Sequence, residues 1–273
     1  MHTAPFTRIA RHTFLALSLS FAASAALAQT SDFKPEVGQA GKDVVWVPTS
    51  QALVDKMLDM AKVTANDYVI DLGSGDGRTV ITAAKRGARA HGIEYNPDMV
   101  DLSKKNAEKE GVAGRATFAK ADIFESDFSQ ATVITLFLLP QLNLKLRPQI
   151  LALKPGTRVV SNSFTMAEWQ DDETFTLDAR DSCNYWCVAH YWVVPAKVEG
   201  TWKTSFGELA LTQQFQMVSG TLRGASGTSN VTGKLLGEQI TLIAGNTTYA
   251  GRVNGNAMEG AAGSGKWSAS KLK

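Results

Sequence analysis

Three glycines at alternate positions, Gly73, Gly75 and Gly77, lie between the apolar stretch Tyr68–Leu72 and a segment of helical periodicity that begins at Arg78. Glycine is required where the backbone needs a positive φ or where a ligand lies directly against the main chain. A strand that leads through such a loop into a helix is typical of the ligand-binding turn of an α/β sheet. This one stretch therefore predicts both the fold class and a ligand-binding loop.

Strand and helix patterns alternate on both sides of this loop. A first helix is expected to begin after Thr49, a good N-cap residue. Strands are then expected at 68–72, 89–95, 116–121, 131–139 and 157–164, with helices at 78–86, 97–111 and 142–153. Two further strands, 174–178 and 186–194, lack a helix between them and are expected to pair as an antiparallel hairpin at the sheet edge. The pattern predicts a doubly wound, Rossmann-like α/β domain over 44–195.

The composition changes after Pro195. Thirteen of the 23 glycines fall in residues 197–273, between short alternating strands. Gly237-Glu238, Gly245-Asn246 and Asn254-Gly255 indicate hairpin turns. One strand is expected to carry Leu209, Leu211, Gln213, Phe215 and Met217 on a single face. Residues 196–273 are therefore predicted to form a small all-β domain of roughly seven strands, a meander barrel or a sandwich, that folds independently.

The first 28 residues have the pattern of a signal peptide. Arg8 and Arg11 precede an apolar stretch at 13–25, and Ala26-Leu27-Ala28 forms a cleavage site before Gln29. The apolar stretch is shorter than the ~20 residues of a membrane span. The pattern predicts export to the bacterial periplasm with no stable membrane span after processing, and residues 29–43 are expected to form an exposed lead-in.

Charge and cysteine content narrow the class further. The chain has a formal charge of +2, and cleavage would remove two arginines and no acid, which leaves it neutral. A neutral chain offers no general electrostatic case for binding nucleic acid. Cys183 and Cys187 are ~13 Å apart in an extended strand, beyond the ~7 Å limit for a disulfide. A bridge therefore requires a turn at 184–186, and two buried thiols are the alternative; no metal site is predicted.

The glycine loop separates two cofactor classes. The dinucleotide fingerprint G-x-G-x-x-G would require glycine at Arg78, where a large charged side chain opposes close packing. The pattern Asp71-x-Gly73-x-Gly75-x-Gly77 instead resembles motif I of class I S-adenosylmethionine (SAM) methyltransferases. Glu94 ends the second strand, where an acid accepts hydrogen bonds from ribose hydroxyls. The resemblance implies that Asp122-Ile123, after the third strand, holds the adenine.

The resemblance extends to the Dot1-like lysine methyltransferases of mitochondria, which modify the c-ring protein of ATP synthase and the adenine nucleotide translocase. It rests on motifs in a shared order over about 44–170: Val47-Pro48-Thr49, Asp71 to Arg78, Gly92 to Pro97, Asp122-Ile123-Phe124, Leu139-Pro140-Gln141, and Ser163-Phe164 with Trp169. It implies a SAM cofactor held by Asp71, Gly73, Ser74, Gly75, Asp76, Gly77, Glu94, Asp122 and Ile123.

The acceptor end is less closely defined. Candidate channel residues are Thr49, Phe137, Pro140, Gln141, Phe164 and Trp169, and no catalytic base is identified. The fourth strand ends in Leu138-Leu139-Pro140 rather than the Asn/Asp-Pro-Pro-Tyr motif of DNA-adenine and glutamine methyltransferases, which argues against those acceptors. Transfer to a protein lysine is the leading hypothesis. A small-molecule methyltransferase and a noncatalytic, exported SAM- or nucleoside-binding protein are the alternatives.

Overall fold

A computed structural model describes residues 1–4, 33–178, 183, 185–225 and 227–272. Apart from its first four residues, the predicted signal peptide 1–28 lies outside this range. Phe33–Lys273 forms one compact unit. In the described part of the chain, no helix is long and apolar enough to cross a membrane.

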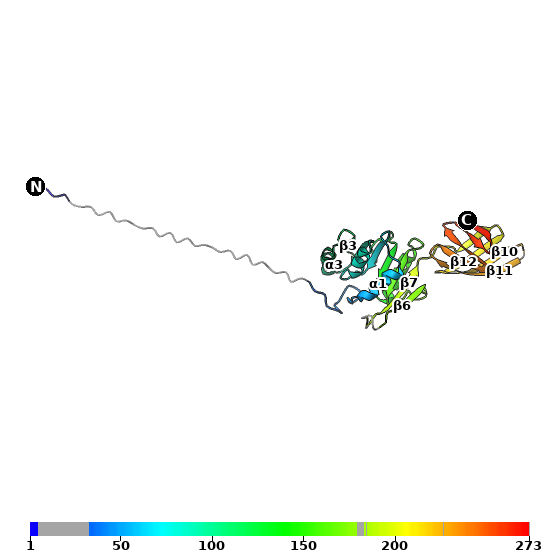
Figure 1. Cartoon of the computed structure of the whole chain (residues 1–273), viewed down its shortest axis with the longest axis horizontal. Coiled ribbons are helices and arrows are strands. Elements are labelled where there is room, and N and C mark those ends of the chain that lie inside the picture. The colour runs from blue at the N-terminus through cyan, green and yellow to red at the C-terminus, as the bar shows by residue number, and fades with distance from the viewer. Residues whose placement is uncertain (5–32, 179–182, 184, 226, 273) are drawn as a thin grey trace. The chain divides into compact units, whose positions relative to one another are not determined.

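The first half of this unit is a seven-stranded mixed sheet in the order β3-β2-β1-β4-β5-β7-β6 (Figure 1). Its strands are β1 Tyr68–Leu72, β2 Arg89–Glu94, β3 Ala116–Lys120, β4 Val133–Leu136, β5 Arg158–Asn162, β6 Glu173–Thr176 and β7 Val188–Val193. The first five are parallel, whereas β7 pairs antiparallel with both β5 and β6. The doubly wound fold and the edge hairpin are confirmed.

The helices follow the strands as the alternation predicted. They are α1 Gln51–Met60, α2 Arg78–Lys85, α3 Pro97–Lys109 and α4 Pro140–Leu151. Asn96 caps α3 by accepting from the Asp98 N–H, and Pro97 opens the helix. The expected cap of α1 is wrong by one residue, because the Ser50 side chain accepts from the Leu53 N–H. Thr49 is thereby left to accept a hydrogen bond from the Asn162 amide at 3.2 Å.

Apolar strands bury both faces of this sheet. In β1, Val69 packs into a core cluster with α1 and α2, while Ile70 and Leu72 pack into a second cluster with α4. Adjacent positions of one strand thus enter opposite cores, as a parallel sheet covered by helices requires. The strand order reverses between β1 and β4, which places a topological switch point beside the glycine loop.

The second half is a closed barrel of eight antiparallel strands rather than seven, and it is not a sandwich. The strands are β8 Gly200–Thr204, β9 Gly207–Gln214, β10 Met217–Gly224, β11 Gly227–Leu236, β12 Gln239–Ala244, β13 Thr247–Asn254, β14 Ala257–Ala262 and β15 Gly265–Lys271. Pairing of β15 with β8 closes it. The strand expected to run through Met217 ends at Gln214, and Phe215, with φ of +53°, lies in the turn to β10.

This β9–β10 turn also contacts the methyltransferase half. The Phe215 ring stacks on Trp169 with centroids 6.2 Å apart and planes 14° apart. The Gln216 amide donates to the Gln170 carbonyl oxygen at 2.7 Å. Phe215 thus packs against the core of the sheet rather than into the barrel core.

Candidate active site

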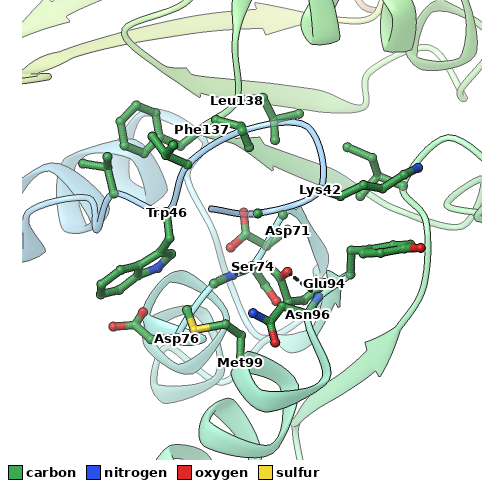
Figure 2. Close-up of a pocket in the computed structure, with 18 of the residues that line it drawn as sticks. Lys42, Trp46, Asp71, Ser74, Asp76, Glu94, Asn96, Met99, Phe137 and Leu138 are labelled. Carbon is green, nitrogen blue, oxygen red and sulfur yellow. Dashed lines mark hydrogen bonds between the residues drawn. The ribbon is translucent and has the colours of Figure 1, made fainter. Parts of the chain in front are cut away.

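A pocket of about 1030 Å³ opens at the ends of β1, β2, β3 and β4 (Figure 2). It is lined by the glycine loop, by Glu94, Tyr95 and Asn96 after β2, by Asp122 and Ile123 after β3, by Leu136 to Leu138 after β4, and by residues 39–49. The residues at 39–43, expected only as a lead-in, therefore contribute to the pocket. The carboxyl ends of strands at a switch point are where α/β sheets bind ligands.

The glycine loop has the conformation that only glycine adopts easily. Gly73, Gly75 and Gly77 have φ of +85°, +54° and +83°. A Cβ at Gly75 would lie 2.7 Å from the Nε1 of Trp46, so the backbone and the indole approach too closely for any side chain. Gly77 caps α2 and does not line the pocket. The loop therefore presents bare backbone to the pocket, which is what a ligand held against the main chain requires.

Glu94 connects this loop to the end of β2. One carboxylate oxygen accepts from the Gly75 N–H at 3.0 Å, and the other accepts from the Asn96 N–H at 2.9 Å. Each carboxylate oxygen has two lone pairs, so Glu94 retains acceptor capacity for ligand hydroxyls. Glu94 therefore both organises the loop and presents an acid to the pocket.

Asp122 lies on the neighbouring strand end and forms an ion pair with Lys42. It also accepts from the Phe124 N–H at 2.9 Å. The hydrogen bond from Lys42, followed by that from Phe124, lowers the pKa of the Asp122 carboxyl. The Lys42 ammonium lies 5.0 Å from the centre of the Tyr95 ring. Asp122 is therefore an ionised acceptor, suited to an exocyclic amine.

Asp71 is the buried acid beneath the loop. It accepts from the Thr135 hydroxyl at 2.6 Å and lines the pocket. Burial raises its pKa to about 7, although the Thr135 hydrogen bond opposes the shift. The nearby Ser74 hydroxyl is also buried and has no hydrogen-bond partner among the described residues. A buried hydroxyl without a partner is costly unless a ligand satisfies it.

Asp76 is already occupied by another side chain. It forms a two-pronged contact with Arg78, with Nη2–Oδ2 at 2.6 Å and Nε–Oδ1 at 3.0 Å. The same guanidinium donates to the Thr49 carbonyl oxygen at 2.8 Å. Asp76 lines the pocket, but its charge is compensated within the protein. Its side chain therefore holds the loop against residue 49.

The predicted acceptor residues separate into three groups. Thr49 and Phe137 line the pocket, and Phe164 stacks on Phe137 with ring centroids 6.2 Å apart. Pro140 and Gln141 open α4 outside the pocket lining. Trp169 lies in the hydrophobic core instead, with no exposed surface, because its ring packs between Trp192 and Phe215.

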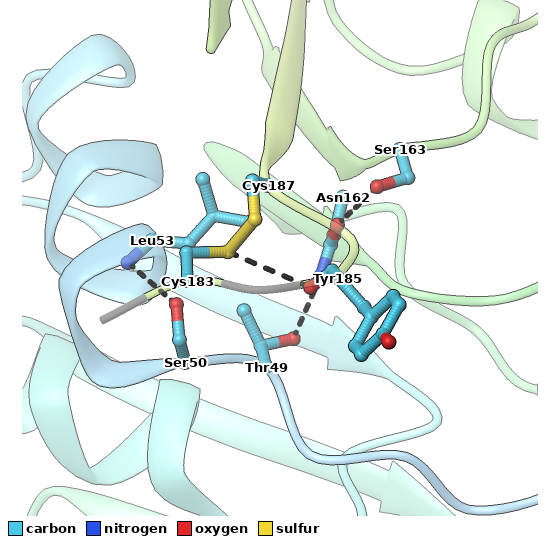
Figure 3. The surroundings of a disulfide bond; sticks show 8 residues. All are labelled: Thr49, Ser50, Leu53, Asn162, Ser163, Cys183, Tyr185 and Cys187. Atoms are coloured by element: carbon cyan, nitrogen blue, oxygen red, sulfur yellow. Dashed lines mark hydrogen bonds between the residues drawn. A yellow bond between two sulfur atoms is a disulfide. The ribbon is translucent and has the colours of Figure 1, made fainter. Parts of the chain in front are cut away.

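Sequence reasoning missed Trp186, which contacts both Phe137 and Phe164. Its loop is closed by a disulfide between Cys183 and Cys187, whose Cα atoms are 5.7 Å apart (Figure 3). The turn that the bridge requires is present, since Trp186 has φ of +60°. The alternative of two buried thiols is therefore wrong. The cysteine spacing was the available signal, but it left both outcomes open.

The donor set fits SAM. Bare glycine backbone, the acid Glu94, the ionised Asp122 and the unpartnered Ser74 hydroxyl provide acceptors for hydroxyls and amines together with one spare donor. Within the described residues, no group of three His, Cys, Asp or Glu side chains is placed to hold a metal ion. The fold and the site define a class I SAM-dependent methyltransferase.

Known proteins give this class a family. Residues 71–173 match the ANTKMT methyltransferase domain. A protein-lysine N-methyltransferase of Saccharolobus islandicus is 46% identical over 138 residues, which cover 50% of this chain and 86% of that protein. The human lysine N-methyltransferase that acts on the c-ring protein of ATP synthase is 36% identical over 128 residues, 46% of this chain and 54% of that protein. The chain belongs to this methyltransferase family, although it spans only about half the length of the human relative.

A solved structure supports the same class. The RNA methyltransferase from Salinibacter ruber in complex with S-adenosyl-L-homocysteine (SAH) is 45% identical, with a TM-score of 0.52, and the match covers 56% of this chain and 96% of that one. SAM is therefore the cofactor, and the resemblance inferred from the motifs is confirmed.

Proposed function

We propose that this protein transfers the SAM methyl group to the side-chain amine of a lysine in an acceptor protein. The observation that carries the proposal is the uncharged end of the pocket, where Phe137 lines the wall and Phe164 stacks behind it. Relatives named as lysine N-methyltransferases, of proteins in general and of ATP synthase in particular, support the same acceptor class.

The chemistry divides between the cofactor and the chain. SAM, when bound, supplies a methyl group activated by a sulfonium, and Glu94 and Asp122 would hold its ribose and adenine. A lysine amine must first lose its proton, which costs about 4–5 kcal/mol at pH 7 from a reference pKa of ~10.4. Apolar aromatic walls such as Phe137 and Phe164 lower that pKa because they exclude water from the charged form.

Methyl transfer from labelled SAM tests the acceptor class. Wild-type protein should label lysine in periplasmic or membrane protein fractions, located by hydrolysis to methyl-lysine. Label in extractable small molecules would favour the alternative reaction, and label in RNA would place the chain beside its structural neighbour of that name. The Glu94→Ala variant is the matched negative control, because it removes a cofactor contact and leaves the aromatic end unchanged.

We also propose that the protein is exported. The signal-peptide pattern of the first 28 residues supports this, and a disulfide at Cys183–Cys187 fits an oxidising compartment. Mass spectrometry of the protein from fractionated cells should find Gln29 at the N-terminus in the periplasmic fraction. An intact Met1 in the cytoplasmic fraction would contradict the proposal.

A further inference from the structure

Trp186 extends the aromatic end of the pocket beyond the residues that line it. Its ring centroid lies 5.3 Å from that of Phe164 and 6.1 Å from that of Phe137. These three side chains, called here the aromatic trio, come from the end of β4, the end of β5 and the loop before β7. Phe137 lines the pocket, whereas Trp186 is 47% exposed. The trio therefore connects the pocket with solvent.

The backbone that holds Trp186 is strained. A positive φ of +60° is unusual for a bulky residue and is retained where the surrounding structure enforces it. The Cys183–Cys187 bridge closes this loop around Trp186. On the facing strand, Ser163 also has φ of +60°, and its N–H donates to the Val188 carbonyl oxygen at 2.7 Å. Two strained residues thus hold Phe164 and Trp186 against each other.

We propose that Trp186, fixed by the Cys183–Cys187 bridge, is an acceptor-binding residue that forms the outer wall of the channel for the acceptor lysine. The proposal rests on the lysine acceptor proposed above. An indole face attracts an ammonium group through its ring quadrupole, and the neighbouring phenyl rings contact the aliphatic part of the lysine side chain. Residues 183–187 lie beyond the 71–173 family match, so this wall is an addition to the shared domain.

A lysine-centred peptide library with labelled SAM provides the assay, and the best peptide from it becomes the probe. Trp186→Ala should raise the KM for that peptide about tenfold while the SAH affinity, measured by calorimetry, stays within twofold. Trp186→Phe should keep most of the peptide affinity. The Cys183→Ser/Cys187→Ser double variant should raise the KM in the same direction, since it releases the loop.

Tyr185 supplies the matched control. It belongs to the same loop, is 84% exposed and lies outside the aromatic trio, so Tyr185→Ala should leave the KM near the wild-type value. Equal KM values for Trp186→Ala and Tyr185→Ala would overturn the inference and leave the proposed function standing. A parallel loss of SAH affinity in Trp186→Ala would also overturn it, since the residue would then support the cofactor pocket. A wild-type protein that labels no lysine peptide would remove the proposed function, and the inference with it.

Discussion

The two ends of the pocket are built on different principles. At the cofactor end, Gly75, Glu94 and Asp122 follow directly after β1, β2 and β3, and the contacts are hydrogen bonds to backbone and ionised groups. At the acceptor end, the aromatic trio collects rings from positions 137, 164 and 186 through packing and a disulfide. The cofactor end follows from local chain geometry, whereas the acceptor end depends on long-range folding.

The largest expected effect lies at the cofactor end. Glu94→Ala removes the acceptor of the Gly75 and Asn96 N–H groups as well as the acid for the ribose. SAH binding should weaken by about 2–4 kcal/mol, because two hydrogen bonds to a charged group are lost. Calorimetry measures this, with Glu110→Ala as the control, since Glu110 forms an exposed pair with Lys85. Unchanged SAH affinity in Glu94→Ala would remove the assigned ribose site.

The same difference explains how far the sequence could predict the site. Asp71, Glu94 and Asp122 were assigned because parallel strands bring their carboxyl ends to one edge. Trp169 was assigned to the channel by its spacing after Phe164, but spacing does not define side-chain direction. A short bridge between Met166 and Trp169 turns the chain there, and the indole enters the core.

The fold shows a similar limit. Most barrel turns contain glycine at the position of positive φ, as at Gly245, so their hairpins could be predicted. The β9–β10 turn, Gln214 to Met217, contains no glycine, asparagine or proline. Phe215 adopts a positive φ there while its ring stacks on Trp169. A tertiary contact accompanies this turn, so no local residue pattern indicated that one strand was two.

Phe215 tests whether the barrel supports the cofactor end. Phe215→Ala removes a half-buried ring from the core of the sheet and should lower the free energy of unfolding by about 2 kcal/mol. SAH affinity should stay within about threefold, because the cofactor contacts come from the strand ends. Denaturant unfolding with and without SAH measures both quantities. Met217→Ala, two residues away and 54% exposed, is the control expected to change neither.

Asp71 gives the cofactor end a pH dependence that the acceptor end lacks. Its pKa is raised by burial from 3.8 to about 7. The stability it contributes to the ligand-free protein is therefore complete below about pH 4 and is lost as the pH rises through 7. SAH affinity should change in the opposite direction and increase about tenfold from pH 6 to 8, since the ionised form favours the ligand ammonium. Asp71→Asn should abolish this dependence, and a persistent tenfold change in that variant would assign it to another group.

Lys42 is expected to have the smallest effect. Its ammonium pairs with Asp122, and the lysine side chain is 35% exposed, so solvent screens the interaction. A ligand amine can replace Lys42 as the donor to Asp122, and Lys42→Ala should therefore change SAH affinity by less than about threefold. Asp122→Ala, in contrast, removes the acceptor itself and should weaken binding about tenfold. Calorimetry at low and high salt separates the two variants. A tenfold weakening in Lys42→Ala would mean that residue 42 contacts the cofactor directly. The cofactor end would then depend on the segment before α1 as well as on the strand ends, and its contrast with the acceptor end would be lost.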